Sequence, residues 1–77
     1  MPRLRPIKRS LFVKYLLSKG CFLKRTVGGH AVYDRKRLNR PVIIQTHFKE
    51  VPINHIKSNL NTLGETLEQF YKDIEDL

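Results

Sequence analysis

Two adjacent glycines, Gly28 and Gly29, stand between short runs of aromatic and β-branched residues and constrain the fold of this chain most strongly. Glycine adopts positive φ without steric penalty, and a two-residue connection of this kind is typical of a tight turn between antiparallel strands. The pair therefore predicts a hairpin whose second strand begins at His30. The turn fixes where the following side chain points, and a histidine with its ordinary pKa of ~6.5 can transfer protons near neutrality.

The hairpin belongs to a longer β region. Aromatic and β-branched residues separated by turn formers predict three strands, over residues 22–26, 30–34 and 41–46. The short first connection favours antiparallel pairing, and the second connection is a longer cationic loop, so the sheet is expected to be an antiparallel meander. Alternation places His30 and Tyr33 on opposite faces of the second strand, but it does not indicate which face is buried.

Helices are predicted on both sides of the strands. Ser10 could cap a first helix over residues 10–19, in which apolar residues recur at helical spacing. A second helix is predicted from Pro52 until Gly64, and Thr66 then opens a capping-box pattern ahead of another apolar repeat. The expected fold class is α+β, with a helix, a three-stranded antiparallel sheet, a helix and an additional short C-terminal helix.

The length of 77 residues suits one small domain with one modest core. Residues 1–9 combine basic side chains with prolines and lack an apolar repeat, so we expect a flexible basic arm there and a single domain over residues 10–77. Cys21 has no second cysteine to pair with, and no apolar run is long enough to span a bilayer. A cytoplasmic location without membrane association is expected.

Charge is distributed unevenly along the chain. Residues 1–49 carry 13 Lys or Arg against one acid, whereas residues 50–77 carry two Lys against six acids. The basic part favours binding to a polyanion such as nucleic acid, with an affinity that falls as salt rises. Charge does not distinguish RNA from DNA, and a surface that is basic only for solubility is the alternative.

The order of elements, together with the segment Gly28-Gly29-His30-Ala31-Val32-Tyr33, resembles the HicA toxins, the mRNA interferases of HicA/HicB toxin–antitoxin systems. The resemblance covers about residues 10–70. The helix-ending glycine of the family matches Gly20, and its first-strand arginine matches Arg25. The histidine that closes its third strand matches His47, and its Gly-x-x-x-Glu-x-Phe ending matches residues 64–70.

The resemblance implies a double-stranded-RNA-binding-domain-like fold and an endoribonuclease in which His30 is the catalytic residue. It also implies that the substrate is mRNA, that a HicB-like antitoxin protein neutralises the enzyme, and that the pair acts in a stress response. The chain departs from the family pattern at Cys21, where an aromatic residue is usual, and at Gln45, where a proline usually precedes the third-strand histidine. Neither departure removes His30.

The chemistry can be derived without the resemblance. RNA cleavage needs only activation of a 2′-hydroxyl, protonation of the leaving 5′-oxygen and support for the charge on phosphorus, so no metal or small-molecule cofactor is expected. Arg25 and His47 are candidates for catalytic or transition-state support. The residues expected to bind RNA are Lys24, Arg25, Gly28, Gly29, Arg35, Lys36, Arg37 and Arg40.

Each of these residues also has a simpler interpretation. His30 could be a hydrogen-bonded strand residue, Arg25 a phosphate-positioning or solvated base, and His47 a cap at the end of a strand or helix. His55 is expected to be structural or exposed to solvent, and the three histidines lack the spacing of a zinc site. The alternative function is a non-catalytic RNA-binding module that uses the same basic surface. A protein-interaction or DNA-binding role has no recognition-helix signature to support it.

Overall fold

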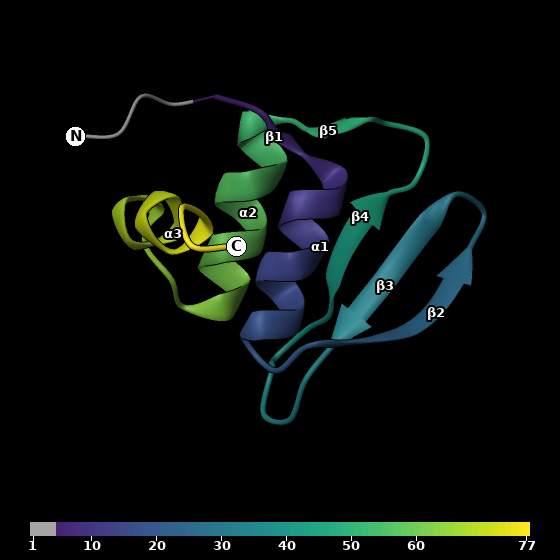
Figure 1. Cartoon of the computed structure of the whole chain (residues 1–77). Coiled ribbons are helices and arrows are strands. Elements are labelled where there is room, and N and C mark those ends of the chain that lie inside the picture. Colours follow the sequence, from purple (N-terminus) through teal and green to yellow (C-terminus); the bar gives the residue numbers. More distant parts are fainter. Residues whose placement is uncertain (1–4) are drawn as a thin grey trace.

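The computed structural model describes residues 5–77 and contains three helices and two antiparallel sheets within that range (Figure 1). The elements are, in chain order, β1 (Ile7–Lys8), α1 (Arg9–Ser18), β2 (Phe22–Val27), β3 (His30–Asp34), β4 (Val42–Gln45), β5 (Glu50–Val51), α2 (Ile53–Leu63) and α3 (Leu67–Ile74). The predicted α+β class is confirmed. None of the helices described is long and apolar enough to cross a membrane.

The main sheet is the expected antiparallel meander, with the strand order β2-β3-β4. The turn between β2 and β3 consists of Gly28 and Gly29, whose φ angles are 53° and 83°. Positive φ at both central residues is the requirement of a type I′ turn, whose twist matches that of the flanking strands. The turn makes Val27 and His30 direct cross-strand partners, so the predicted hairpin and the start of its second strand are confirmed.

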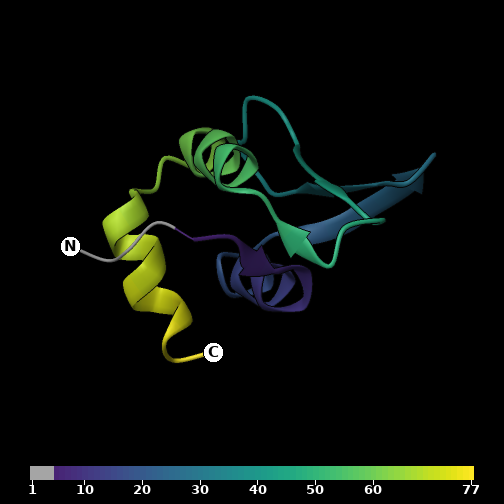
Figure 2. The same ribbon diagram turned by 90° about the horizontal axis from the view of Figure 1, so that it is seen from above.

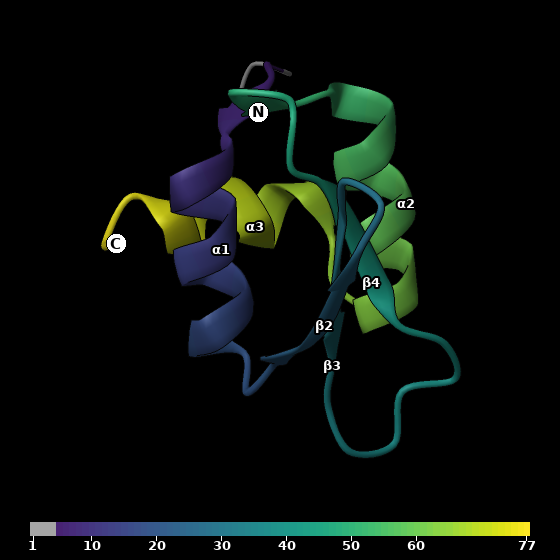
Figure 3. The same cartoon turned by 90° about the vertical axis from the view of Figure 1, so that its right-hand side faces the viewer.

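The two faces of the sheet have different surroundings. Ala31 and Tyr33 of β3 are buried in the core together with Val42 and Ile44 of β4. We call this the inner face, and we call the opposite face, which carries His30, the outer face. Figure 2 shows the sheet extending away from the helices, and Figure 3 shows α1 and α2 on either side of it, with α2 alongside β4.

Aromatic side chains make up the centre of the core. Phe12 and Tyr15 of α1 are fully buried and pack against Phe70 of α3. The rings of Tyr15 and Phe70 meet edge to face, with 4.7 Å between their centroids, which is a favoured geometry for aromatic pairs. The periodic apolar residues that predicted the first and last helices therefore pack together in the core.

The ends of the helices follow the sequence signals in part. The Thr66 hydroxyl accepts a hydrogen bond from the backbone N–H of Gln69 at 3.1 Å, as the capping-box pattern predicts, but the Gln69 side chain donates to Asp73 instead of returning to residue 66. Ser10 does not cap α1, so that prediction is wrong. The helix begins one residue earlier, and the backbone N–H of Arg9 donates to the Lys49 carbonyl at 2.8 Å.

The N-terminal segment differs from the expected flexible arm over residues 1–9. Ile7 is only 3% exposed, and β1 pairs with β5 through the partners Ile7 with Val51 and Lys8 with Glu50. Residues 7–9 therefore belong to the folded domain, because burial of Ile7 and backbone pairing hold them against the chain near residue 50. Residues 1–4 of the expected arm lie outside the described part of the chain.

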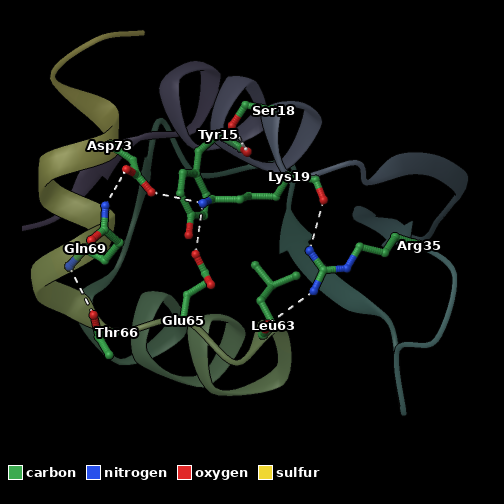
Figure 4. Close-up of polar contacts among 9 residues, drawn as sticks. All are labelled: Tyr15, Ser18, Lys19, Arg35, Leu63, Glu65, Thr66, Gln69 and Asp73. Carbon is green, nitrogen blue, oxygen red and sulfur yellow. Dashed lines mark hydrogen bonds and ion pairs between the residues drawn. The ribbon is translucent and has the colours of Figure 1, made fainter.

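Two basic side chains join the helices to one another (Figure 4). Lys19 Nζ lies 2.9 Å from Glu65 Oε1 and 3.0 Å from Asp73 Oδ2, so it links the end of α1 to α3 and to the segment before it. The Arg35 guanidinium donates to the carbonyl of Lys19 at 2.9 Å and to that of Leu63 at 3.2 Å. These carbonyls lie at the C-terminal ends of α1 and α2, where helices lack internal donors.

Candidate functional site

His30 is the first residue of β3 and lies at the tip of the β2–β3 hairpin. Its side chain is exposed on the outer face, whereas the next three residues of the strand are buried. Its direct partner on β4 is Gln45, as the predicted return of the third strand requires. Among residues 5–77 no group forms a hydrogen bond with the imidazole. The exposed imidazole is therefore accessible to a ligand.

Arg25 lies on the same face as His30, two residues from Val27, which is the cross-strand partner of His30. The register between β2 and β3 shifts between Leu23, which pairs with Tyr33, and Arg25, which pairs with Val32. The pairing is regular from Val27 to Arg25, so alternation alone places Arg25 on the outer face, and the bulge changes only the faces of Leu23 and Phe22. Arg25 is the diagonal neighbour of His30, a relationship that corresponds to roughly 7–8 Å in an antiparallel pair.

His47 follows β4 and lies in the turn beside the glycine pair. Its imidazole packs against Gly29, in space that a side chain at that position would fill. The carbonyl of Gly29 accepts hydrogen bonds from the Thr46 backbone N–H at 2.8 Å and from Thr46 Oγ1 at 3.0 Å. These contacts place the turn after β4 directly against the hairpin tip that carries His30.

Arg9 binds the backbone on both sides of His47. Its guanidinium donates to the carbonyl of Thr46 and, at 3.2 Å, to that of Phe48. This role was not predictable from the sequence, because Arg9 is one of several basic residues near the N-terminus and its partners lie nearly forty residues away. Arg9 is a positioning residue for His47.

A groove runs from His30 along β4 and α2. It has a volume of about 390 Å³ and is open to solvent. The sheet contributes His30, Ile43 and Gln45, and the loop before β4 contributes Arg40 and Pro41. Helix α2 contributes four polar residues, namely His55, Ser58, Asn59 and Thr62. Asn59 is buried, and its Nδ2 donates to the Ile43 carbonyl at 3.4 Å, which ties α2 to the edge of β4.

The groove residues on α2 were not identified as a group from the sequence, and His55, which is partly exposed, is one of them. Positions 55, 58, 59 and 62 follow the spacing i, i+3, i+4, i+7, which places them on one face of a helix. That spacing could have been found by applying the periodicity test to polar residues as well as to apolar ones. The sequence could not predict which residues of the sheet face these α2 side chains across the groove, because that depends on how α2 packs against β4.

The basic residues expected to bind RNA are divided among several places. Arg25 lies beside His30, and Arg40 lies in the groove, where its Nε donates to Thr62 Oγ1 at 3.1 Å. Lys36 and Arg37 are exposed in the β3–β4 loop, at the opposite end of β3 from the hairpin tip (Figure 1). These two bases therefore do not surround His30.

Two of the basic residues expected to bind RNA already have partners within the protein. Arg35 is partly buried and bound to the two helix-end carbonyls described above, so we assign it a structural role in place of the expected RNA contact. Lys24 lies 3.7 Å from the Asp34 carboxylate in an exposed ion pair. Exposed pairs of this kind are weak, so Lys24 is able to exchange that partner for a phosphate.

The arrangement provides proton transfer and cationic charge. In residues 5–77 no three His, Cys, Asp or Glu side chains are grouped to hold a metal ion. Cys21 is buried, and burial raises the pKa of its thiol, so it is not activated as a nucleophile. The accessible groups near the hairpin tip are instead the imidazoles of His30 and His47 and the guanidinium of Arg25.

No protein-family model matches the chain, and no match was found among curated proteins or among solved structures.

Proposed function

We propose that this protein is a metal-independent endoribonuclease that cleaves mRNA through His30. The observation that carries the proposal is the exposed imidazole of His30 on the outer face, with Arg25 as its diagonal neighbour on that face and His47 packed beside the adjoining glycine. The resemblance of the glycine–histidine segment to the HicA toxins supports the same chemistry. We extend the proposal to a double-stranded-RNA-binding-domain-like fold and to action in the cytoplasm.

The proposed reaction uses only side chains of this chain and the RNA itself. His30 removes the proton from a ribose 2′-hydroxyl, whose oxygen attacks the neighbouring phosphorus. The bond to the 5′-oxygen breaks, and the imidazolium of His47 gives that oxygen a proton. Arg25 stabilises the negative charge on the phosphoryl oxygens. The products are a 2′,3′-cyclic phosphate and a free 5′-hydroxyl, and positioned acid–base catalysis of this kind contributes roughly 100- to 10,000-fold in rate.

We also propose a HicB-like antitoxin as the partner that neutralises the enzyme. The resemblance is the source of this proposal. The outer face adds support, because Phe22, Val27 and Ile43 are all exposed on it around Arg25 and His30. Exposed apolar side chains grouped around a functional residue are typical of a protein-binding surface, and a partner bound there would cover His30.

One observation favours a second function, that of a non-catalytic RNA-binding module. A catalytic histidine is commonly oriented by a hydrogen bond from its second ring nitrogen. The part of the chain that the structure describes supplies no such partner for His30. In this alternative His30 contacts only phosphate or sugar, and the basic surface binds RNA without cutting it.

The experiment that separates the two functions is incubation of a long transcript with purified protein in EDTA. The enzyme produces fragments with 2′,3′-cyclic phosphate and 5′-hydroxyl ends, and single-stranded DNA of the same sequence stays intact. His30→Ala is expected to remove cleavage while keeping the thermal unfolding midpoint, because the side chain is exposed. Lys72→Ala, an exposed position on α3, is the control for an alanine substitution outside the proposed site.

The alternative outcomes are distinct. A retarded but intact transcript identifies the binding module. Cleavage by folded His30→Ala that equals wild-type cleavage rejects His30 as the catalytic residue, whatever the remaining source of activity.

A further inference from the structure

We propose that the groove between β4 and α2 binds one nucleotide of single-stranded RNA beside the scissile phosphate. This inference rests on the proposed function and deepens it, because it names the form of RNA that the site accepts. The groove shares His30 with the proposed catalytic site, so a base lying in it brings its own ribose and phosphate next to that imidazole.

The groove has the chemical character of a nucleobase site. Gln45 and Asn59 supply amide groups, Ser58 and Thr62 supply hydroxyls, and the exposed Ile43 supplies an apolar surface between them. Amides and hydroxyls can both donate and accept hydrogen bonds, as the edges of nucleobases can. No acidic side chain lines the groove to repel phosphate.

Several of these polar groups have no internal partner. Within residues 5–77 the side chains of Gln45, His55 and Ser58 form no hydrogen bond, and Asn59 uses only its Nδ2, leaving its carbonyl oxygen unpaired. Arg40 uses one of its five N–H donors on Thr62. The remaining donors of Arg40 lie at the end of the groove away from the hairpin tip and are suited to the phosphate on the far side of the bound base.

The size of the groove selects single strands. Its volume of about 390 Å³ is at the lower end of the range of roughly 300–1,000 Å³ found for small-ligand sites, which suits one nucleoside whose base edge reaches the polar groups of the groove. A base must therefore be unstacked and unpaired to enter, which is how proteins read RNA sequence in loops and ends.

The test uses a single-stranded RNA hexanucleotide with 2′-O-methyl groups, which lacks the attacking hydroxyl and is not cleaved. It is titrated into ¹⁵N-labelled protein, in parallel with a duplex of the same sequence. We expect the amide signals of Gln45, His55, Ser58 and Thr62 to shift with the single strand and not with the duplex. Ser58→Leu, which fills the groove, is expected to weaken binding about tenfold, the effect of losing one or two hydrogen bonds.

Asn61→Leu is the matched control, because Asn61 is exposed on α2 and does not line the groove. It is expected to bind the hexanucleotide within twofold of wild type. Ser58→Leu is also expected to redistribute the cleavage positions along a natural transcript, which is measured by sequencing fragment ends, while Asn61→Leu leaves them unchanged. Circular dichroism melts of both variants establish that they are folded.

The outcomes separate this inference from the proposed function. If His30-dependent cleavage is present but Ser58→Leu and Asn61→Leu bind and cut alike, the groove is not a nucleotide site and the enzyme assignment stands. If the groove signals shift and Ser58→Leu weakens binding without any cleavage by wild type, the nucleotide site stands and the enzyme assignment fails. Equal or tighter binding of the duplex overturns the inference.

Discussion

The imidazole of His47 lies against Gly29, where a Cβ at residue 29 would overlap it. The equivalent position at Gly28 is open, with no atom within 4 Å. The two glycines of one turn therefore have different functions. Both supply the positive φ that the hairpin requires, but only Gly29 also leaves room for the side chain that we propose as the second acid–base group.

The glycine pair provides a direct test of that contact. Gly28→Ala introduces left-handed backbone strain of about 1–2 kcal/mol, and Gly29→Ala introduces the same strain and also displaces His47. We expect urea unfolding to show a larger loss of stability for Gly29→Ala. We also expect RNA cleavage to fall further in Gly29→Ala than in Gly28→Ala at equal folded fraction. Equal losses of cleavage in the two variants would show that the position of His47 does not affect the reaction.

Arg35 is expected to stabilise the fold and not to bind RNA. Arg35→Met keeps much of the side-chain volume but removes the donors to the carbonyls of Lys19 and Leu63. Hydrogen bonds to charged groups contribute about 1.5–3 kcal/mol each. Because Arg35 is only partly buried and the bond to Leu63 is long at 3.2 Å, we expect the free energy of unfolding to fall by about 2–4 kcal/mol, less than the sum of two such bonds. Lys36→Met, one residue further along the exposed loop, should change it by less than about 0.5 kcal/mol. Chemical denaturation of the three proteins provides the comparison, and similar stabilities of the two variants would contradict the structural role.

The elements that the sequence predicted correctly are those whose signals are local. The turn at Gly28-Gly29, the apolar repeats of the helices and the cap at Thr66 each depend on residues within a few positions of one another. The pairing of β1 with β5 joins residues more than forty positions apart, and each strand has only two residues. A strand that short has no period to detect, so Ile7 resembled part of a basic tail.

The candidate site was predictable only in part for the same reason. His30 could be identified from its own segment, and the return of β4 to place Gln45 opposite it followed from the expected meander. The face of Arg25 is given by alternation back from the glycine turn, whereas the bulge that sets the faces of Leu23 and Phe22 is not revealed by the sequence pattern. The groove depends on the packing of α2 against β4, and the bond between Asn59 and the Ile43 carbonyl that maintains it is a tertiary contact.

Alkaline pH is expected to destabilise the protein through Tyr15. Burial, followed by the nearby Glu65 carboxylate, raises the pKa of Tyr15 from 10.0 to about 12. Between these values the folded chain binds more protons than the unfolded chain, so the free energy of unfolding falls as pH rises. The contribution of Tyr15 to the free energy of unfolding is fully present below pH 10 and decreases by about 2–3 kcal/mol by pH 12. The hydrogen bond from Lys19 to Glu65 also raises the pKa of Lys19, so its contribution is lost in the same direction.

Tyr15→Phe isolates this effect. The Tyr15 hydroxyl is buried and has no hydrogen-bond partner among the residues described, and a buried unsatisfied group costs about 1–3 kcal/mol. Its removal should raise stability at pH 7 by about 1 kcal/mol and reduce the decline between pH 9 and pH 12. Urea unfolding at a series of pH values measures both changes. A decline in Tyr15→Phe as steep as in wild type would assign the alkaline sensitivity to other groups.

The salt dependence of RNA affinity should show which basic side chains contact phosphate. Each phosphate neutralised on a single strand adds about 0.7 to the magnitude of the slope of log affinity against log salt. Arg25→Gln should therefore lower that slope by about 0.7 for the 2′-O-methyl hexanucleotide, because Arg25 is exposed beside His30. Arg35→Met, measured under conditions where it is folded, should leave the slope unchanged because Arg35 is bound to carbonyls within the protein. Lys72→Gln should also leave it unchanged because Lys72 lies on α3. If Arg25→Gln weakens binding without changing the slope, Arg25 acts on the RNA by some means other than neutralising a phosphate, and its proposed part in charge stabilisation is wrong.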